Sequence, residues 1–245
     1  MQEFPLTRFD DLVTLSPAEA EVLRSLGKDA VLYRRNAVIR RDREPVGAIY
    51  MLLEGWASSA IRLPNGQRQI IKVHIPGDMM GTPSMALETA ADTLTAITEC
   101  RVSAVPLTRL RELLVAYPRL GGVLFLFVQI ERIALMDIVA SMGKSSARER
   151  LVRLLLDLHD RLSTIGVVAD GTFDLPLTQE QIGDVLGLTS VHVNRTMRLL
   201  EREGLVVREG HRIVLCDLAA LRQISPLPPR RLRADPPWLP QPGEL

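Results

Sequence analysis

The stretch from Leu175 to Val207 constrains the fold more than any other part of the sequence. Thr178 and Gln181 have the spacing of a capping box, in which each side chain hydrogen-bonds an otherwise unpaired backbone N–H at the start of a helix. Gly187 can adopt the left-handed conformation that ends a helix, and Thr189 is suited to cap the next one. The pattern predicts two short helices joined by a tight turn, with a β-hairpin after them.

The second of these helices has two opposed faces. At 100° per residue, Val193, Met197 and Leu200 fall together and should pack inward. The opposite face carries Val191, Arg195, Arg198 and Arg202, flanked by His192 and Asn194. Side chains of this kind can pair with phosphates and with guanine edges in the major groove of DNA. A basic face that is merely solvated is the alternative, but the capping box, the glycine turn and the hairpin together favour DNA binding.

The composition limits the other classes. The 245 residues suffice for two modest domains, and a hydrophobic content of 47% supports real cores. A net charge of +1 means that any DNA-binding surface must be local. Cys100 and Cys216 are expected to be reduced cytoplasmic thiols. The N-terminus lacks a signal-peptide pattern, and the apolar run Gly121–Val128 is shorter than the roughly 18 residues of a membrane span. We therefore expect a cytoplasmic protein without a membrane partner.

The residues before the long helix predict a β-rich domain. Residues 1–28 should be helical, and Ser16 to Glu19 have the pattern of an N-cap, a first-turn proline and an acidic first turn. Short strands are then expected at residues 31–33, 37–39, 48–53, 57–63, 69–75 and 102–105. Pro64-Asn65-Gly66 and Pro76-Gly77-Asp78 are turn signals. Strands at about ten-residue spacing are typical of a sandwich or jelly-roll barrel.

A short helix is expected over Leu107–Ala116, and a long one over Arg119–Met142. The long helix has an apolar seam that consists of Leu120, Leu124, Phe127, Ile130, Ala134 and Ile138. Because other faces of this helix are apolar as well, it needs two partners: its own barrel and the same helix of a second chain. A helix buried wholly within one chain is the alternative. Residues 143–146 are the expected hinge.

The fold class is therefore α+β, with an N-terminal β-jelly-roll, a long dimerisation helix and a C-terminal winged helix-turn-helix. The predicted boundaries are 1–116 for the barrel, 117–143 for the dimerisation helix and hinge, 144–224 for the DNA-binding domain, and 225–245 for the tail. The tail is too rich in proline to suggest packing and is expected to be extended or disordered.

This order of parts resembles the CRP/FNR superfamily of bacterial regulators, over about residues 10–224. The most specific local matches are Leu177–Gly183 and Leu186–Arg195, supported by the turn Ile75–Asp78. The resemblance implies a homodimer on a palindromic double-stranded DNA site, with half-sites about one helical turn apart. It also implies RNA polymerase as a partner if promoters are activated.

Carried onto this sequence, the family's base-contacting positions are Ser190, Val191, His192, Asn194, Arg195 and Arg198. The positions expected to contact phosphates are Thr178, Gln179 and Thr189 at helix N-termini, and His211 and Arg212 in the wing. Many members have an Arg-Glu pair where this chain has Ser190-Val191. Arg195 should therefore be the main base reader, on a target that differs from that of the best-known relatives.

The effector pocket departs from the family pattern. The family's cyclic-nucleotide pocket uses a Gly-Glu and an Arg-Ser/Thr, and the corresponding residues here are Gly81, Thr82, Pro83, Ser84, Asp92 and Thr93. Thr82 replaces the glutamate, and Asp92 stands near where a phosphate would need a cation. Cyclic AMP is therefore not expected in the usual mode, and a form that is active without ligand fits this pocket.

No cofactor is predicted. An iron–sulfur cluster of the family type needs four cysteine ligands, which two cysteines cannot supply. Haem stays open, since the chain has His74, His159, His192 and His211, although a hydrogen-bonded structural histidine is favoured at His74.

The alternatives to a DNA-binding regulator fall into two classes. One is a ligand-binding module that regulates a partner protein through its C-terminal domain. The other is an enzyme, which we do not expect, because the sequence has no glycine-rich phosphate loop, metal-ligand cluster, nucleophile elbow or carboxylate pair with a base.

Overall fold

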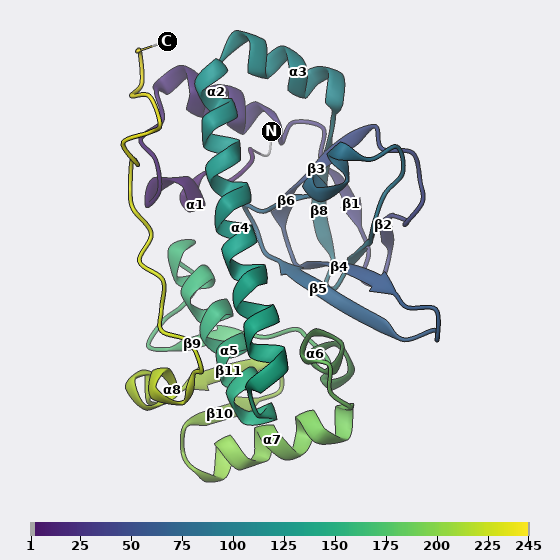
Figure 1. Ribbon diagram of the computed structural model, residues 1–245, viewed down its shortest axis with the longest axis vertical. Helices are drawn as coiled ribbons and strands as arrows, with labels where there is room; N and C mark the ends of the chain where they lie inside the picture. Colours follow the sequence, from purple (N-terminus) through teal and green to yellow (C-terminus); the bar gives the residue numbers. More distant parts are fainter. Residues whose placement is uncertain (1–2, 245) are drawn as a thin grey trace. The chain divides into compact units, whose positions relative to one another are not determined.

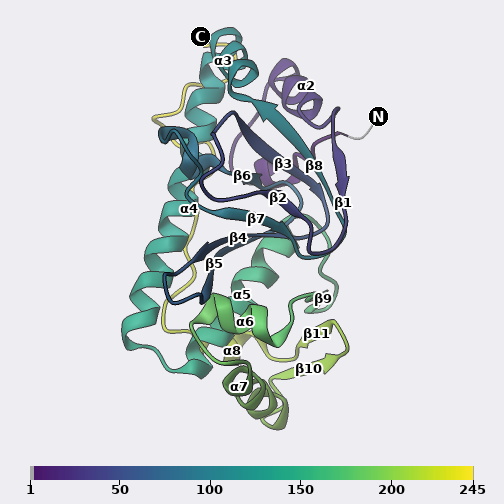
Figure 2. The same cartoon turned by 90° about the vertical axis from the view of Figure 1, so that its right-hand side faces the viewer.

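Two antiparallel sheets of four strands each dominate the first part of the computed structural model, which describes residues 3–244 (Figure 1). The strand orders are β1-β8-β3-β6 and β2-β7-β4-β5. The strands are β1 Val31–Tyr33, β2 Val38–Arg40, β3 Ala48–Glu54, β4 Ala57–Arg62, β5 Arg68–His74, β6 Met79–Met80, β7 Thr93–Ala96 and β8 Cys100–Pro106. Figure 2 shows the two sheets facing one another, so the expected jelly-roll sandwich is confirmed.

The space between the sheets is filled by one apolar cluster. It consists of Leu52, Ala57, Met80, Leu94, Ala96, Cys100 and Val102, with Tyr33, Ile39 and Tyr50 packed against it. Strand β7 shows the alternation that a strand requires, because Leu94 and Ala96 are buried while Thr93 and Thr95 are only half-buried. The sequence prediction missed β7 and β6, since four and two residues are too few to establish a period.

The helices of this part are α1 Thr7–Asp10, α2 Pro17–Ser25, the 3₁₀ helix η1 Thr82–Ala86 and α3 Leu107–Ala116. Helix α2 begins at the predicted N-cap, where a capping box forms: the Ser16 hydroxyl accepts from Glu19 N at 3.2 Å, and the Glu19 carboxylate accepts from Ser16 N at 2.8 Å. Helix α3 has the predicted bounds.

The long helix α4 spans Pro118–Lys144. Of its predicted seam, Leu120 and Phe127 are buried within this chain, and Leu124, Ile130, Ala134 and Ile138 are half-buried. The exposed apolar side chains of α4 are Phe125, Val128, Ile133, Leu135, Met136, Val139 and Met142. Leu120 and Phe127 therefore pack within this chain, as expected for one of the two apolar faces of α4, and the face expected to contact a second chain stays a prediction.

Helix α4 begins in one compact unit and ends in the other. The first unit runs to Gln129 and resumes at Leu232, and the second comprises Ile130–Arg231. Gly143, expected in the hinge, lies inside α4, and the helix ends before Ser145. Residues 1, 2 and 245, which fall in the predicted barrel domain and tail, lie outside the described residues.

The second unit is a helical domain with a small sheet. Its elements after α4 are α5 Ala147–Thr164, β9 Thr172–Asp174, α6 Gln179–Leu186, α7 Ser190–Arg202, β10 Val206–Glu209, β11 Arg212–Leu215 and α8 Leu218–Ile224. The sheet order is β10-β11-β9, all antiparallel. Helix α5 packs Leu151, Leu155 and Leu158 at 0% exposure into the core of this unit. The predicted winged helix-turn-helix is therefore confirmed.

The proline-rich tail, which the sequence predicted to be extended or disordered, makes specific contacts with other segments. Its last part, from Leu232, belongs to the first unit. There the Asp235 carboxylate accepts hydrogen bonds from Thr14 N and Thr14 Oγ1, both at 2.7 Å. Pro236 and Leu239 are buried. The prediction rested on the high proline content of the tail, but Asp235 and Leu239 find partners far away in the sequence.

Candidate nucleic-acid interface

The turn between α6 and α7 is built as the sequence predicted. Thr178 Oγ1 accepts from Gln181 N at 3.1 Å, and Gln181 Oε1 accepts from Thr178 N at 2.9 Å. Gly187 ends α6 at φ 65°, in the left-handed region. Thr189 Oγ1 accepts from His192 N at 3.2 Å and so caps α7. The start of α7 is thereby fixed by bonds made within a few residues of sequence.

Gly183 is a determinant of this turn that sequence reasoning missed. Leu188 N donates to Gly183 O at 3.0 Å, which draws the turn tightly against α6. A Cβ atom at Gly183 would lie 2.5 Å from the backbone oxygen of Leu188, too close for any side chain. Only glycine fits this position, and a glycine within an amphipathic helix is the signal that could have shown it.

Helix α7 divides into an inner and an outer face. Val193, Met197 and Leu200 are buried on the inner face, as predicted. On the outer face, Ser190, Arg195, Arg198 and Arg202 are exposed, and Val191 is 77% exposed. An apolar side chain that stands this far into solvent at the first turn of a helix, beside guanidinium groups, forms a surface suited to base edges.

Asn194 and Gln179 are joined, although the sequence assigned them to base and phosphate contacts separately. Asn194 Nδ2 donates to Gln179 Oε1 at 3.1 Å, which links α7 to the start of α6. Asn194 and His192 are both half-buried. These half-buried side chains lie at the edge of the outer face, where Asn194 links the two helices.

The wing presents the other predicted phosphate contacts. Gly210 turns the hairpin at φ 63°, and the neighbouring His211 and Arg212 are exposed. His211 O accepts from Leu175 N at 2.7 Å, so the hairpin tip is tied to the segment that leads into α6. The wing and the helix pair are thus parts of one unit.

Two arginines of α5 hold the helix pair, and neither was identified from the sequence. Arg150 Nη1 donates to Leu186 O at 2.7 Å, at the C-terminal end of α6. Arg148 Nη2 pairs with Glu203 at 2.6 Å, just beyond the end of α7. Both contacts join residues that are far apart in the sequence, so no local pattern predicts them.

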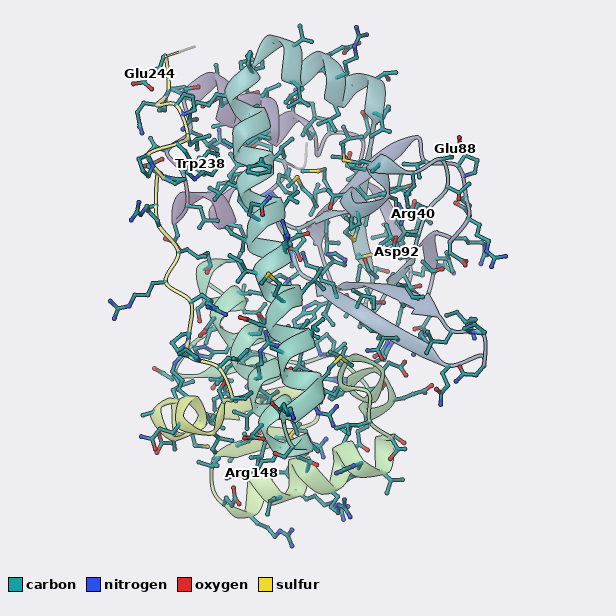
Figure 3. The ribbon with its side chains drawn as sticks, in the orientation of Figure 1. Arg40, Glu88, Asp92, Arg148, Trp238 and Glu244 are labelled. Carbon is teal, nitrogen blue, oxygen red and sulfur yellow. The ribbon has the colours of Figure 1, made fainter. Side chains whose placement is uncertain are left out.

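The predicted effector residues gather around the 3₁₀ helix in the barrel, but internal contacts occupy them. The buried Arg40 donates through Nη2 to the Asp92 carboxylate, and the two side chains point toward one another in Figure 3. Gly81 lies against this guanidinium group, since a Cβ there would be 2.8 Å from Arg40 Nη1. Ser84 Oγ accepts from Ala91 N at 3.2 Å. Sequence reasoning missed Arg40, which neutralises Asp92.

The remaining predicted pocket residues are spread around this pair. Thr82 is half-buried and Pro83 exposed. Thr93 Oγ1 accepts from Asp42 N at 3.1 Å. The Arg40 guanidinium lies 6.0 Å from the centre of the Tyr50 ring, and burial raises the pKa of Tyr50. The predicted pocket residues thus surround one buried polar pair, in which Arg40 Nε and Nη1 have no hydrogen-bond partner among the described residues.

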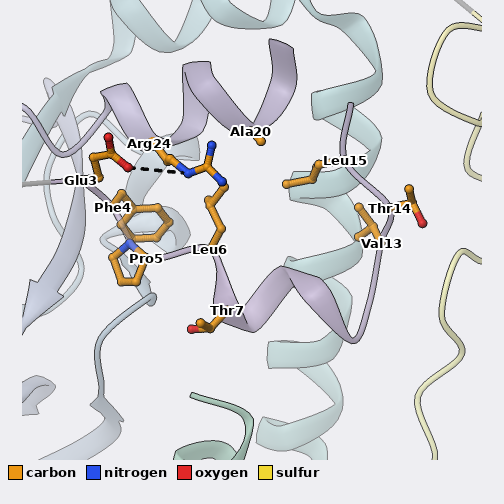
Figure 4. Close-up of a pocket in the computed structure, with 10 residues that line it drawn as sticks. All are labelled: Glu3, Phe4, Pro5, Leu6, Thr7, Val13, Thr14, Leu15, Ala20 and Arg24. Carbon is orange, nitrogen blue, oxygen red and sulfur yellow. Dashed lines mark ion pairs between the residues drawn. The ribbon is translucent and has the colours of Figure 1, made fainter. Parts of the chain in front are cut away.

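A separate surface pocket of about 560 Å³ lies beside α1 and α2 (Figure 4). It is lined by residues 3–7 and 13–15 together with Ala20 and Arg24, and an Arg24–Glu3 ion pair of 3.6 Å spans part of its wall. None of the predicted effector residues lines this pocket.

The histidines and cysteines of the described residues form no cluster that could bind a metal ion. The buried His74 Nε2 is 2.7 Å from Ser59 Oγ, and His159 Nδ1 is 3.0 Å from Asp160. Among residues 3–244, no group of three or more His, Cys, Asp or Glu side chains could hold a metal ion. Within the same range, no helix is long and apolar enough to cross a membrane.

Comparisons with known proteins agree with this arrangement. Residues 149–224 match the family model of the Crp-like helix-turn-helix domain, and residues 30–117 that of the cyclic nucleotide-binding domain. The transcriptional activatory protein AadR of Rhodopseudomonas palustris is 32% identical over 194 residues, which are 79% of each chain. The nitrogen fixation regulation protein FixK of Bradyrhizobium diazoefficiens is 29% identical over 213 residues, 86% of this chain and 88% of that one.

The solved structure of FixK2 from Bradyrhizobium japonicum superposes with a TM-score of 0.74 at 26% identity and covers 81% of this chain and 97% of that one. These relatives are transcription regulators, which confirms that the chain is not an enzyme. The barrel, the long helix and the winged helix-turn-helix, together with these similarities, show that the chain belongs to the CRP/FNR family of DNA-binding transcription regulators.

Proposed function

We propose that this regulator binds a palindromic DNA site as a homodimer, with the α7 helix of each chain in one of two successive major grooves. The observation that carries the proposal is the outer face of α7, where Val191, Arg195 and Arg198 stand exposed while the opposite face is buried. Two such helices one helical turn apart would read half-sites about 34–36 Å apart.

Arg195 is the main base reader in this proposal. Its guanidinium group can donate two hydrogen bonds to the O6 and N7 atoms of a guanine, and such a pair discriminates by about 1–3 kcal/mol against the wrong base. Ser190 and Val191 are short, and Val191 offers an apolar surface to a thymine methyl group. His192, Asn194 and Arg198 complete the reading surface.

Phosphate contacts set the position of α7 in the groove. Thr178, Gln179 and Thr189 lie at helix N-termini, where backbone N–H groups and the helix dipole favour anions. His211 and Arg212 would reach the backbone from the wing. These contacts carry no sequence information, but they make binding dependent on salt.

Self-association through α4 supplies the second recognition helix. The exposed side chains of Phe125, Val128, Arg132, Leu135, Val139 and Met142 recur alternately three and four residues apart. This is the spacing by which one helix packs along another in a coiled coil, and a second copy of α4 has the same spacing. The exposed seam supports a parallel pair of chains.

The barrel does not bind cyclic AMP in the usual mode, in our proposal. Asp92 is already paired with Arg40, and Thr82 stands where the family's ribose-binding glutamate would be. Calorimetric titration with cyclic AMP should therefore give no binding heat. Micromolar binding would contradict this part of the proposal.

We propose that the protein acts in the cytoplasm, where bacterial DNA lies, and that it activates promoters through RNA polymerase. Activation is proposed by analogy with the activatory protein AadR. In vitro transcription from a promoter that carries the selected site should rise when the protein is added. A fall would show repression instead.

Selection from random double-stranded DNA tests the proposed function. We expect an enriched inverted repeat that Arg195→Ala loses or relaxes at one base pair of each half-site. Arg202→Ala is the matched control, because it removes the same charge from an exposed position at the other end of α7 and should weaken binding without changing the motif. Unchanged recognition by Arg195→Ala would overturn the assignment and favour a protein partner for this domain.

A further inference from the structure

The C-terminal segment Leu232–Glu244 packs on the first unit, although its proline-rich composition does not predict packing. It returns to the first unit and contacts the N-terminal half of α4, and Figures 1 and 3 show it as a yellow trace without helix or strand. We call this segment the strap. Its four prolines fix φ at their positions and so reduce the entropy lost when the strap docks.

The strap is anchored by buried contacts. Arg119 on α4 donates through Nε to Pro240 O, through Nη2 to Thr14 O at 2.8 Å and through Nη1 to Glu19 at 2.9 Å. Both side chains of the Arg119–Glu19 pair are almost fully buried. Removing the strap would leave one donor of this buried network without its acceptor.

Leu239 fits against a gap in α4. Its side chain is 3% exposed, and a Cβ atom at Gly122 would lie 2.6 Å from Leu239 Cδ1. The absence of a side chain at Gly122 therefore makes room for the strap. Asp235 adds two hydrogen bonds to Thr14, and these bonds hold the pKa of the Asp235 carboxyl below its usual range.

The Trp238 side chain, unlike that of Leu239, is exposed to solvent. Its ring packs edge-to-face on Phe125, with centroids 5.9 Å apart and planes at 84°. Both rings nevertheless stay open to solvent, since Trp238 is 51% and Phe125 55% exposed. A strap that served to cover α4 would bury Phe125, whereas this one places a second large aromatic ring beside it. Such exposed aromatic pairs are typical of binding surfaces.

We propose that the strap extends the self-association face of α4, and that Trp238 and Phe125 of one chain pack against the second copy. The inference rests on the proposed homodimer. Phe125 is the first residue of the exposed seam of α4, and the exposed Trp238 ring packs against it and so widens the apolar surface. Because the seam has coiled-coil spacing, the occupant that fits it is an identical chain. Aromatic side chains of this kind dominate the affinity of interfaces.

The test measures the dimer dissociation constant of the full chain by analytical ultracentrifugation. Trp238→Ala removes the outward ring and leaves the anchors in place, and we expect the dissociation constant to rise at least about tenfold. Leu239→Asp releases the strap from α4 and should weaken the dimer to a similar degree. Trp238→Phe keeps an aromatic ring and should retain most of the affinity.

Fluorescence gives a second readout, because the chain has only two tryptophans. In a Trp56→Phe background, the emission of Trp238 should shift to the red on dilution, with the same midpoint as dissociation. An unchanged dissociation constant in Trp238→Ala and Leu239→Asp would overturn the inference alone. Tighter dimers in both would overturn it too and show a strap that competes with the partner. A wild-type chain that stays monomeric would overturn the homodimer itself, and the inference with it.

Discussion

Replacing Gly183 by alanine tests how the recognition turn is built. The added methyl group would lie 2.5 Å from Leu188 O, and this atom belongs to the backbone and cannot rotate away. Overpacking of a well-filled site costs about 1–3 kcal/mol. Alanine recovers about 1 kcal/mol in a helix relative to glycine. We therefore expect Gly183→Ala to lower the free energy of unfolding by up to about 2 kcal/mol.

The DNA affinity should fall as well, because the turn can relieve the clash only by moving α7. Such a shift would strain the Asn194–Gln179 bond of 3.1 Å. We expect at least about a tenfold loss of affinity for the selected site, which corresponds to roughly 1.4 kcal/mol.

Gly143→Ala is the matched control. Gly143 lies in α4 within the same unit, with nothing within 4 Å of its Cβ position. The same substitution should therefore stabilise the protein by up to about 1 kcal/mol. Denaturant unfolding and fluorescence-anisotropy titration with DNA measure both effects. A Gly183→Ala variant that unfolds and binds like the wild type would refute the steric argument.

Three further predictions concern charge and thiol chemistry. Arg132 interrupts the exposed seam of α4, so Arg132→Leu should tighten self-association in ultracentrifugation; an unchanged or weaker dimer would place the interface elsewhere. Burial raises the pKa of the Cys100 thiol to about 11, whereas Cys216 is exposed. Iodoacetamide at about pH 8 should therefore alkylate only Cys216 in the folded protein. Detection of alkylated Cys100 by mass spectrometry would contradict this prediction. Hydrogen bonds from Ser146 hold the pKa of the Glu149 carboxyl below its usual range. The contribution of Glu149 to stability is therefore present above its unfolded-state pKa and is lost as the pH falls through the lower pKa of the folded state. An NMR titration that gave an ordinary pKa for Glu149 would contradict the capping box.

Local patterns predicted the recognition unit well. The capping box at Thr178 depends on residues three positions apart, and the turn at Gly187 on a single backbone conformation. Patterns this short are complete within the sequence window that reveals them. The alternation of buried and exposed positions on α7 could be predicted for the same reason.

Contacts between distant segments could not be predicted in this way. Arg40 and Asp92 are 52 residues apart, and Thr14 and Asp235 are separated by 221 residues. The sequence also left open which side of α4 faces the core, because apolar side chains occur on most sides of that helix. The side of α4 that faces the core is set by residues outside the helix, which the periodicity of its own sequence cannot reveal. One of them is Phe9, whose ring centroid lies 4.4 Å from that of Phe127.

The spacing between half-sites tests the paired arrangement of recognition helices most directly. Insertion of about five base pairs at the centre of the selected inverted repeat turns one half-site to the opposite side of the DNA. Since α4 would hold two copies of α7 at a fixed separation, we expect the affinity to fall to that of a single half-site. Equal affinity for the original and the extended sites would contradict the paired arrangement, because it would mean that each half-site is bound independently.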